Sequence, residues 1–320
     1  MSTDAAIHHD LLSAVRGEIA KVIVGQDEVV DGLLVALIVG GHALLEGVPG
    51  TAKTLLATTL AAALDLDVRR VQFTPDLMPS DLLGRVVYRQ ETGDFVFHEG
   101  PIFTNVLLGD EINRTPPKTQ SALLEAMQER QVSVEGHARR LPEPFVVVAT
   151  QNPVEYEGTY PLPEAQVDRF LVKLTVGYPD ATQERAMLER HHAGFDATDV
   201  AAAGVRAVAG PGAIAAVRAE AAAVRVDDRI IGYLVELARA TRGSPSVQLG
   251  VSPRGLAMLL HTAKAWALLT GRDFVTPDEV QAMVPPTWRH RLVLRPEVEL
   301  EGATPDAVLR GLLRATVVPR

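Results

Sequence analysis

The chain has 320 residues, enough for one large α/β domain and a smaller second domain. Hydrophobic residues make up 47% and charged residues 22%, so the chain can bury a full core and is not disordered throughout. A net charge of −9 disfavours DNA or RNA as the main partner, and the absence of cysteine excludes disulfides, thiolate metal sites and cysteine nucleophiles.

The N-terminal region carries no targeting pattern. The first ten residues contain acid and histidine, not a basic and then apolar leader. The longest apolar stretch, residues 33–45, is interrupted by Gly40, Gly41 and His42 and is too short to cross a bilayer. These features favour a cytoplasmic protein without a membrane span.

Two helices and a series of strands are expected in the first half. Apolar residues recur with a helical period over residues 10–23, and a second helix is expected over about 26–39. Short apolar runs then alternate with helical segments, at residues 43–46, 68–73, 106–110, 145–150 and 170–176. Because several runs are apolar throughout, they predict a doubly wound α/β domain around a five-stranded parallel sheet.

Two stretches interrupt this alternation and predict β-hairpins. Residues 85–98 surround a turn at Thr92-Gly93-Asp94, and residues 131–141 contain a turn at Glu135-Gly136. On their residues alone, these hairpins could equally be plain surface decoration.

The second half is expected to be helical. Asp180 and Gln183 form a capping-box pattern that begins a helix, and Gly194 ends it. Residues 195–212 lack periodicity and indicate a linker or a weakly ordered helix. Further helices are then expected over about 228–241, 253–270 and 277–283. The predicted organisation is an α/β nucleotide-binding core over residues 1–180, followed by a connector and an all-helical domain over residues 181–320.

The strongest functional signal is a glycine-rich segment between a predicted strand and a predicted helix. Its residues are Gly47, Val48, Pro49, Gly50, Thr51, Ala52, Lys53 and Thr54, followed by Leu55. In this setting backbone N–H groups and the helix N-terminus surround the phosphates of a nucleotide. Lys53 would reach the β- and γ-phosphates, and the Thr54 hydroxyl would bind Mg²⁺. Ala52 replaces the usual glycine before the lysine, which is expected to be tolerated if its dihedral angles are helical. The alternative is a structural turn.

The second signal is a pair of carboxylates. Asp110 and Glu111 follow an apolar run, at the strand edge where open α/β sheets bind ligands. Asp110 is expected to hold Mg²⁺, through water, and Glu111 to polarise the water that attacks the γ-phosphate. Alone, such a pair would more often cap a strand, but the glycine-rich segment upstream favours the catalytic role.

Longer segments carry a family resemblance. They are GPIFTN at 100–105, DEINR at 110–114, PPKTQ at 116–120, LLEAMQE at 123–129 and PLPEAQVDRF at 161–170. With these segments the chain resembles the MoxR family of AAA+ ATPases over about residues 20–180, and again in the helical half. The resemblance implies a P-loop AAA+ αβα sandwich followed by a helical lid, with ATP bound between them and hydrolysed with Mg²⁺.

The resemblance also assigns residues that pattern alone leaves open. Asn152 would be the polar sensor that orients the attacking water, although a lone asparagine after a strand is more often a turn residue. Arg169 would be an arginine finger that reaches a neighbouring subunit's nucleotide, with Arg114 as second choice. Val24 and Gly25 would pack against the adenine.

Arg254 is singled out by its position. Ser252 and Pro253 are a natural N-cap and first helical residue, which places Arg254 in a first turn, where the helix dipole disfavours a cation. The resemblance makes Arg254 the lid arginine that contacts the γ-phosphate. The plain alternative is a solvated arginine.

The resemblance further implies partners. It indicates a ring of like subunits, commonly a hexamer, that remodels or matures client proteins as a chaperone, often with von Willebrand A-domain partners. The two hairpins would project from the ring, where they could contact the client. Alternatives are another ATPase motor, of the magnesium-chelatase or transcription-activator kind, and a nucleotide-gated assembly module with little turnover. Glu111, Asn152 and Arg169 argue against the last.

Overall fold

The computed structural model describes residues 3–319 except 49, 153–157, 197–198 and 201. Its α/β half is built on β1 (Ala43–Glu46), β2 (Val68–Gln72), β5 (Val106–Asp110), β8 (Val146–Gln151) and β9 (Val172–Thr175). They form one sheet in the order β2-β5-β8-β1-β9, with parallel pairing throughout. The predicted five-stranded parallel sheet is confirmed.

Helices cover both faces of this sheet, as the alternation within β1 shows. Ala43 and Leu45 pack in one core cluster with α1 (Thr3–Ala20), α2 (Asp27–Val39) and α3 (Lys53–Ala63). Leu44 points to the other face. There it joins a second cluster with residues of α4 (Pro79–Leu83) and α5 (Pro117–Glu129). Successive strand residues face opposite sides, so a strand buried on both faces must be apolar throughout.

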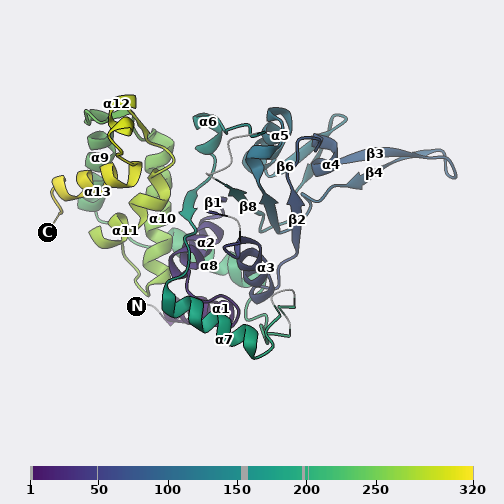
Figure 1. The fold of residues 1–320 in the computed structure, drawn as a ribbon, viewed down its shortest axis with the longest axis horizontal. Coiled ribbons are helices and arrows are strands. Elements are labelled where there is room, and N and C mark those ends of the chain that lie inside the picture. The colour runs from purple at the N-terminus through teal and green to yellow at the C-terminus, as the bar shows by residue number, and fades with distance from the viewer. Residues whose placement is uncertain (1–2, 49, 153–157, 197–198, 201, 320) are drawn as a thin grey trace.

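Two antiparallel hairpins branch from this domain. One consists of β3 (Gly84–Arg89) and β4 (Asp94–Glu99), and the other of β6 (Gln131–Val134) and β7 (His137–Arg140). The β3–β4 hairpin projects from the end of the molecule opposite the helical domain (Figure 1). The guanidinium of Arg139 lies 4.0 Å from the centre of the Phe97 ring, so the second hairpin braces the first.

The base of the β3–β4 hairpin is a close crossing of backbone. A Cβ at Gly84 would lie 2.4 Å from the carbonyl oxygen of His98, and a Cβ at Gly100 would lie 2.2 Å from that of Leu82. Neither position has room for a side chain, which explains the two glycines. The hairpin therefore begins and ends at one tightly packed point.

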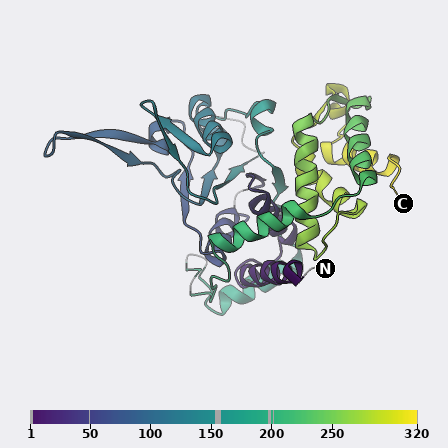
Figure 2. The ribbon, with the colours of Figure 1, turned by 180° about the vertical axis from the view of Figure 1, so that it is seen from behind.

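The helical domain lies at the other end, as the two opposite views agree (Figures 1 and 2). Its elements, with the connecting helices, are α7 (Ala181–His192), α8 (Pro211–Ala223), α9 (Asp228–Gly243), α10 (Pro253–Leu269), α11 (Pro277–Trp288), α12 (Pro296–Leu300) and α13 (Pro305–Ala315). The short α6 (Glu164–Val167) precedes β9 and belongs to the α/β half. A short antiparallel pair, β10 (Val247–Leu249) and β11 (Val293–Leu294), corrects the expectation that no strands follow residue 179. Within the described residues, no helix is both long and apolar enough to cross a membrane.

Two helices differ from expectation. α8 begins at Pro211, at the end of the stretch expected as a linker or a weakly ordered helix, and runs through residues for which no element was predicted; only Ile214, Val217 and Ala221 of this alanine-rich helix are buried. The apolar period of α8 was therefore weak. α11 continues to Trp288 instead of ending near residue 283, although it contains Pro285 and Pro286. Burial of Trp288 offsets the backbone bonds lost at these prolines.

His42 is a buried histidine with a defined tautomer. The Val147 N–H donates to Nδ1 at 3.0 Å, so the proton lies on Nε2, which donates to the Met127 carbonyl at 3.1 Å. Burial is the main reason that the pKa of His42 is lowered to about 4. A protonated ring would turn Nδ1 into a donor facing another donor.

This histidine makes stability depend on pH. Because its folded pKa lies below the unfolded value of about 6.5, the unfolded chain binds more protons between these values. The stabilisation by neutral His42 is thus complete above pH 6.5 and is lost as the pH falls to 4, by about 3 kcal/mol. We expect the free energy of unfolding, measured by denaturant titration from pH 7 to 4, to fall further for wild type than for His42→Gln. Parallel curves would contradict this.

Candidate active site

The ends of parallel strands bring the predicted residues to one edge of the sheet. The glycine-rich loop follows β1, Asp110 ends β5, and Asn152 follows β8. The Gly47 N–H donates to the Gln151 carbonyl at 3.3 Å, which ties the start of the loop to the end of β8. Loop, acidic pair and Asn152 are therefore neighbours because of strand order.

Lys53 folds back over its own loop. Its Nζ donates to the carbonyl oxygens of Gly47 at 2.5 Å and Val48 at 3.2 Å, and the Thr51 hydroxyl also donates to Val48, at 2.9 Å. Burial lowers the pKa of Lys53, while the negative charges of Asp110 and Glu111 oppose this shift. The ammonium group thus lies within the field of both carboxylates. Pro49 is outside the described residues.

The condition stated for Ala52, helical dihedral angles, is not met. Its φ of 59° and ψ of 22° are left-handed, a conformation that costs a non-glycine residue about 1–2 kcal/mol. Glu111 (φ 60°) and Gln26 (φ 62°) share this conformation. Such strained residues persist where the surrounding structure holds them, and they often mark functional sites. Helical dihedral angles therefore do not explain how alanine is accommodated at position 52.

A cavity of about 560 Å³ lies over the loop. Of the predicted residues it is lined by Val24, Gly50, Thr51, Ala52, Lys53, Thr54, Leu55 and Asp110. Its far wall is α7 with the chain just before and after it, through side chains that the sequence did not identify as part of a site: Tyr178, Gln183, Met187, His191 and Phe195. The volume and the largely apolar wall suit a nucleotide base beside the phosphate loop.

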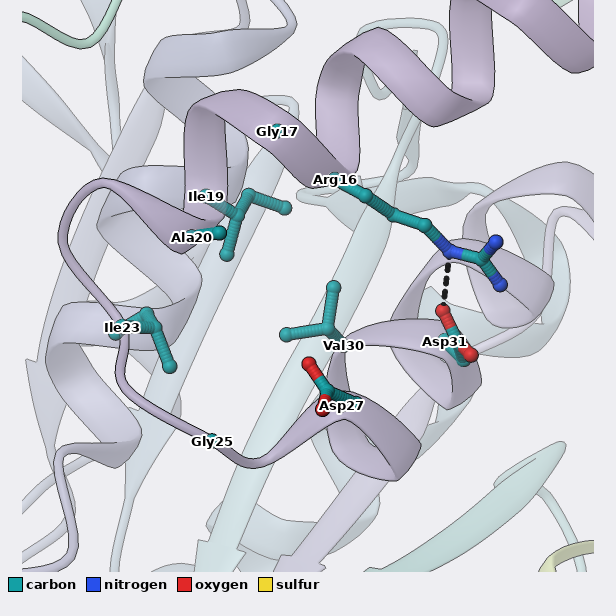
Figure 3. A pocket seen from close by; sticks show the side chains of 9 residues that line it. All are labelled: Arg16, Gly17, Ile19, Ala20, Ile23, Gly25, Asp27, Val30 and Asp31. Carbon is teal, nitrogen blue, oxygen red and sulfur yellow. Dashed lines mark hydrogen bonds and ion pairs between the residues drawn. The ribbon is translucent and has the colours of Figure 1, made fainter. Parts of the chain in front are cut away.

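Gly25 lines a second cavity, of about 400 Å³, between the end of α1 and the start of α2 (Figure 3). In that cavity Arg16 donates to Asp31 at 2.6 Å. Val24 and Gln26 face the first cavity, so the chain around Gly25 separates the two. Burial raises the pKa of Asp31, and Arg16 opposes that shift.

The acidic pair has partners that sequence reasoning missed. Asp110 accepts from Arg70 Nε at 2.6 Å, and Glu111 accepts from Gln72 Nε2 at 2.7 Å. The Thr150 hydroxyl donates to Asp110 at 3.3 Å and accepts from the Glu111 N–H at 3.0 Å. Both β2 side chains, two residues apart on one face, could have been noticed as polar residues within a predicted strand.

Asp110 and Thr54 fit a magnesium ion chemically. Both line the cavity, and Mg²⁺ is usually bound by one or two hard oxygen ligands of the protein together with phosphate oxygens and water. Among the described residues, no group of three or more histidine or acidic side chains is placed to hold a metal, so a magnesium ion here would depend on phosphate oxygens and water for its other ligands.

The predicted arginines lie elsewhere. Arg169 and Arg254 line one hollow of about 220 Å³, with Arg130 and His261, and neither lines the cavity over the loop. Arg169 Nη1 donates to the Leu124 carbonyl at 2.8 Å. Arg114 instead approaches Glu111, at 3.3 Å. Neither Arg169 nor Arg254 therefore lies on the cavity that its own chain forms over the loop, and contact of Arg254 with a γ-phosphate stays a prediction.

Comparisons with known proteins agree with this geometry. Residues 42–172 match the model of the ATPase family associated with various cellular activities (AAA), and residues 239–312 match that of the AAA lid domain. Chaperone MoxR1 of Mycobacterium tuberculosis is 42% identical over 312 residues, covering 95% of this chain and 81% of that protein. Protein MoxR of Methylorubrum extorquens is 35% identical, covering 94% and 93%.

Two further relatives cover nearly the whole chain. YeaC of Bacillus subtilis, described as uncharacterized, is 47% identical over 311 residues, covering 97% of this chain and 96% of that protein. A crystal structure described as a "putative ATPase" from Cytophaga hutchinsonii superposes with a TM-score of 0.90 at 39% identity. It covers 99% of this chain and 97% of the other.

Proposed function

Because this chain belongs to the MoxR family of AAA ATPases, we propose that it hydrolyses ATP with Mg²⁺ as a ring of like subunits. The observation that carries the proposal is the shared cavity. Lys53, Thr54 and Asp110 line one space, and Glu111 directly follows Asp110. In this arrangement the loop binds the phosphates, and Lys53 offsets the negative charge that develops on the γ-phosphate.

Each remaining residue has a role in this proposal. Thr54 and Asp110 would hold Mg²⁺, which supplies charge neutralisation at the phosphates when bound. Glu111, held by Gln72, would accept the proton of the attacking water, and Asn152 would orient that water. Val24, which lines the cavity over the loop, would contact the base, whereas Gly25 lines the neighbouring cavity and would shape the chain beside it.

The ring is supported by the position of the arginines. Arg169 and Arg254 line a hollow separate from the cavity over the loop, so their charges are not offered to the nucleotide of the same chain. Head-to-tail contact between identical subunits would bring this hollow to a neighbour's nucleotide, and such contacts close into rings. Both arginines would then act in trans, while Arg114 stays with its own Glu111.

For the biological role we favour a chaperone that remodels or matures partner proteins, a class to which the relative MoxR1 is assigned by name. The projecting β3–β4 hairpin carries Tyr88 and Phe95, whose tilted rings have their centres 5.2 Å apart, with Phe95 74% exposed. Such exposed aromatic side chains suit contact with a protein client. A partner with a von Willebrand A domain is one client to test by co-purification.

ATP binding is tested by Lys53→Ala. Loss of a charged donor to phosphate should raise the dissociation constant for ATP about 10–100-fold, since such hydrogen bonds contribute about 1.5–3 kcal/mol. The measurement is titration with a fluorescent ATP analogue. Lys264→Ala, which removes the same charge from α10 outside the cavity, is the control and should bind as wild type does. Full affinity in Lys53→Ala would refute the proposed site.

A further inference from the structure

A buried arginine joins the helical domain to the segment that carries Arg169. Arg291 follows α11, and its side chain is 2% exposed. Its Nε donates to Asp168 Oδ1 at 2.7 Å, and its Nη2 donates to the carbonyl oxygens of Asp168 at 3.0 Å and Phe170 at 2.5 Å. Its Nη1 donates to the Leu171 carbonyl at 3.2 Å. The guanidinium of Arg291 thus donates hydrogen bonds to the backbone on both sides of Arg169.

The same side chain packs against the first turn of α10. A Cβ at Gly255 would lie 2.8 Å from Arg291 Cδ, so only glycine leaves room for the arginine stem beside Arg254. Arg291 Nη2 also lies 2.7 Å from Met258 Sδ. Arg291 therefore lies between the two segments that carry Arg169 and Arg254.

The hollow described above is built from these two segments. Arg169 and Leu171 line it from the strand side, and Arg254 and Met258 line it from α10. Each of these residues is either a direct contact of Arg291 or a sequence neighbour of one. The relative position of the half-buried Arg169 and the exposed Arg254 thus depends on a third cation, the buried Arg291.

A buried arginine such as Arg291 is an unfavourable choice if its only role is to stabilise the fold. Burial lowers the pKa of Arg291 to about 10, with Asp168 opposing this shift and the nearby charge of Arg254 adding to it. Buried ion pairs are often no more stabilising than apolar residues of similar size. Only the planar fork of arginine can serve a carboxylate and several carbonyl groups together, so lysine is not an equivalent.

We propose that Arg291 is a positioning residue that locks the Asp168–Leu171 segment against the first turn of α10, so that Arg169 and Arg254 act on a neighbouring subunit's nucleotide as one pair. The inference rests on the proposed function. Arg291 itself touches no nucleotide in this scheme; it sets where two other side chains are held.

The test removes both members of the buried pair. Replacing one alone would leave a buried charge uncompensated and could unfold the subunit, so the variant is Arg291→Met with Asp168→Asn. We expect its dissociation constant for a fluorescent ATP analogue to stay within about threefold of wild type, because Arg291 does not line the nucleotide cavity. We expect its ATP turnover to fall about 10–100-fold, the usual effect of misplacing catalytic groups by about an ångström.

A mixing experiment separates positioning from general damage. The double variant is co-expressed in equal amounts with Glu111→Gln, which has intact arginines but an impaired site of its own. If the defect lies in what a subunit gives its neighbour, about a quarter of the interfaces pair an intact site with intact arginines, and about a quarter of wild-type turnover returns. A structurally damaged subunit would not recover.

The outcomes are distinct. Unchanged turnover in the double variant, lost ATP affinity, or loss of turnover without recovery on mixing would each overturn the role of Arg291. Arg169→Ala mixed with Glu111→Gln is the parallel arm. If that mixture also fails to recover, it is the proposed action in trans that is wrong; if it alone recovers, only the inference about Arg291 fails.

Discussion

Replacing Glu111 with glutamine is expected to reduce ATP turnover about 10²–10⁴-fold, the contribution typical of a positioned general base. The glutamine keeps the size of the side chain and can still contact Gln72, but it cannot take a proton from water. ATP affinity should change little, because Glu111 is not among the residues lining the cavity over the loop. The measurement is phosphate release at saturating ATP, alongside titration with a fluorescent analogue.

The matched control is Glu236→Gln on α9, an exposed glutamate remote from the cavity lining. It should retain wild-type turnover. Undiminished turnover in Glu111→Gln would remove the assigned base, and negligible turnover in wild type would favour a nucleotide-gated assembly module instead.

Replacing Arg169 with alanine is expected to reduce turnover about 10³–10⁵-fold, the range measured for arginine fingers in other phosphoryl-transfer systems. The affected site should belong to the neighbouring subunit, because Arg169 does not line the cavity of its own chain. In mixed assemblies, rising amounts of a subunit that carries both Arg169→Ala and Glu111→Gln, whose own site is impaired, should therefore depress the turnover of wild-type subunits below the plain sum, whereas Glu111→Gln alone should give that sum. Arg310→Ala on α13, an exposed arginine, is the control.

A mixture whose rate is the plain sum of its two components would contradict action in trans. Size-exclusion chromatography of the same samples, with and without ATP, shows whether the subunits assemble at all. Together, the mixing rates and the chromatography distinguish a failure of the subunits to assemble from a wrong assignment of Arg169.

Features encoded in contiguous residues were the most predictable. The central sheet follows from apolar runs such as residues 106–110, because strands buried on both faces have no polar alternation. The glycine-rich loop is likewise local, since one short segment supplies both the turn and the helix N-terminus. Its position between strand and helix was accordingly expected.

Features that depend on tertiary neighbours were not predictable. Arg70 pairs with Asp110 only because β2 lies beside β5 in the sheet. The order of strands in a sheet cannot be predicted from the local sequence. The meeting of Arg169 with Arg254 depends on how the helical domain docks, through Arg291. At Ala52 the residue type gave no sign of its left-handed backbone, because alanine rarely adopts it.

The close crossing at Gly84 and Gly100 has a mechanical consequence. The β3–β4 hairpin leaves and rejoins the domain at one point without slack, and only six residues separate the end of β4 at Glu99 from the start of β5 at Val106. A load on the hairpin tip therefore passes into the strand that ends at Asp110 instead of being absorbed in a loose hinge. In this way the β3–β4 hairpin is coupled rigidly to Asp110, the carboxylate expected to hold Mg²⁺.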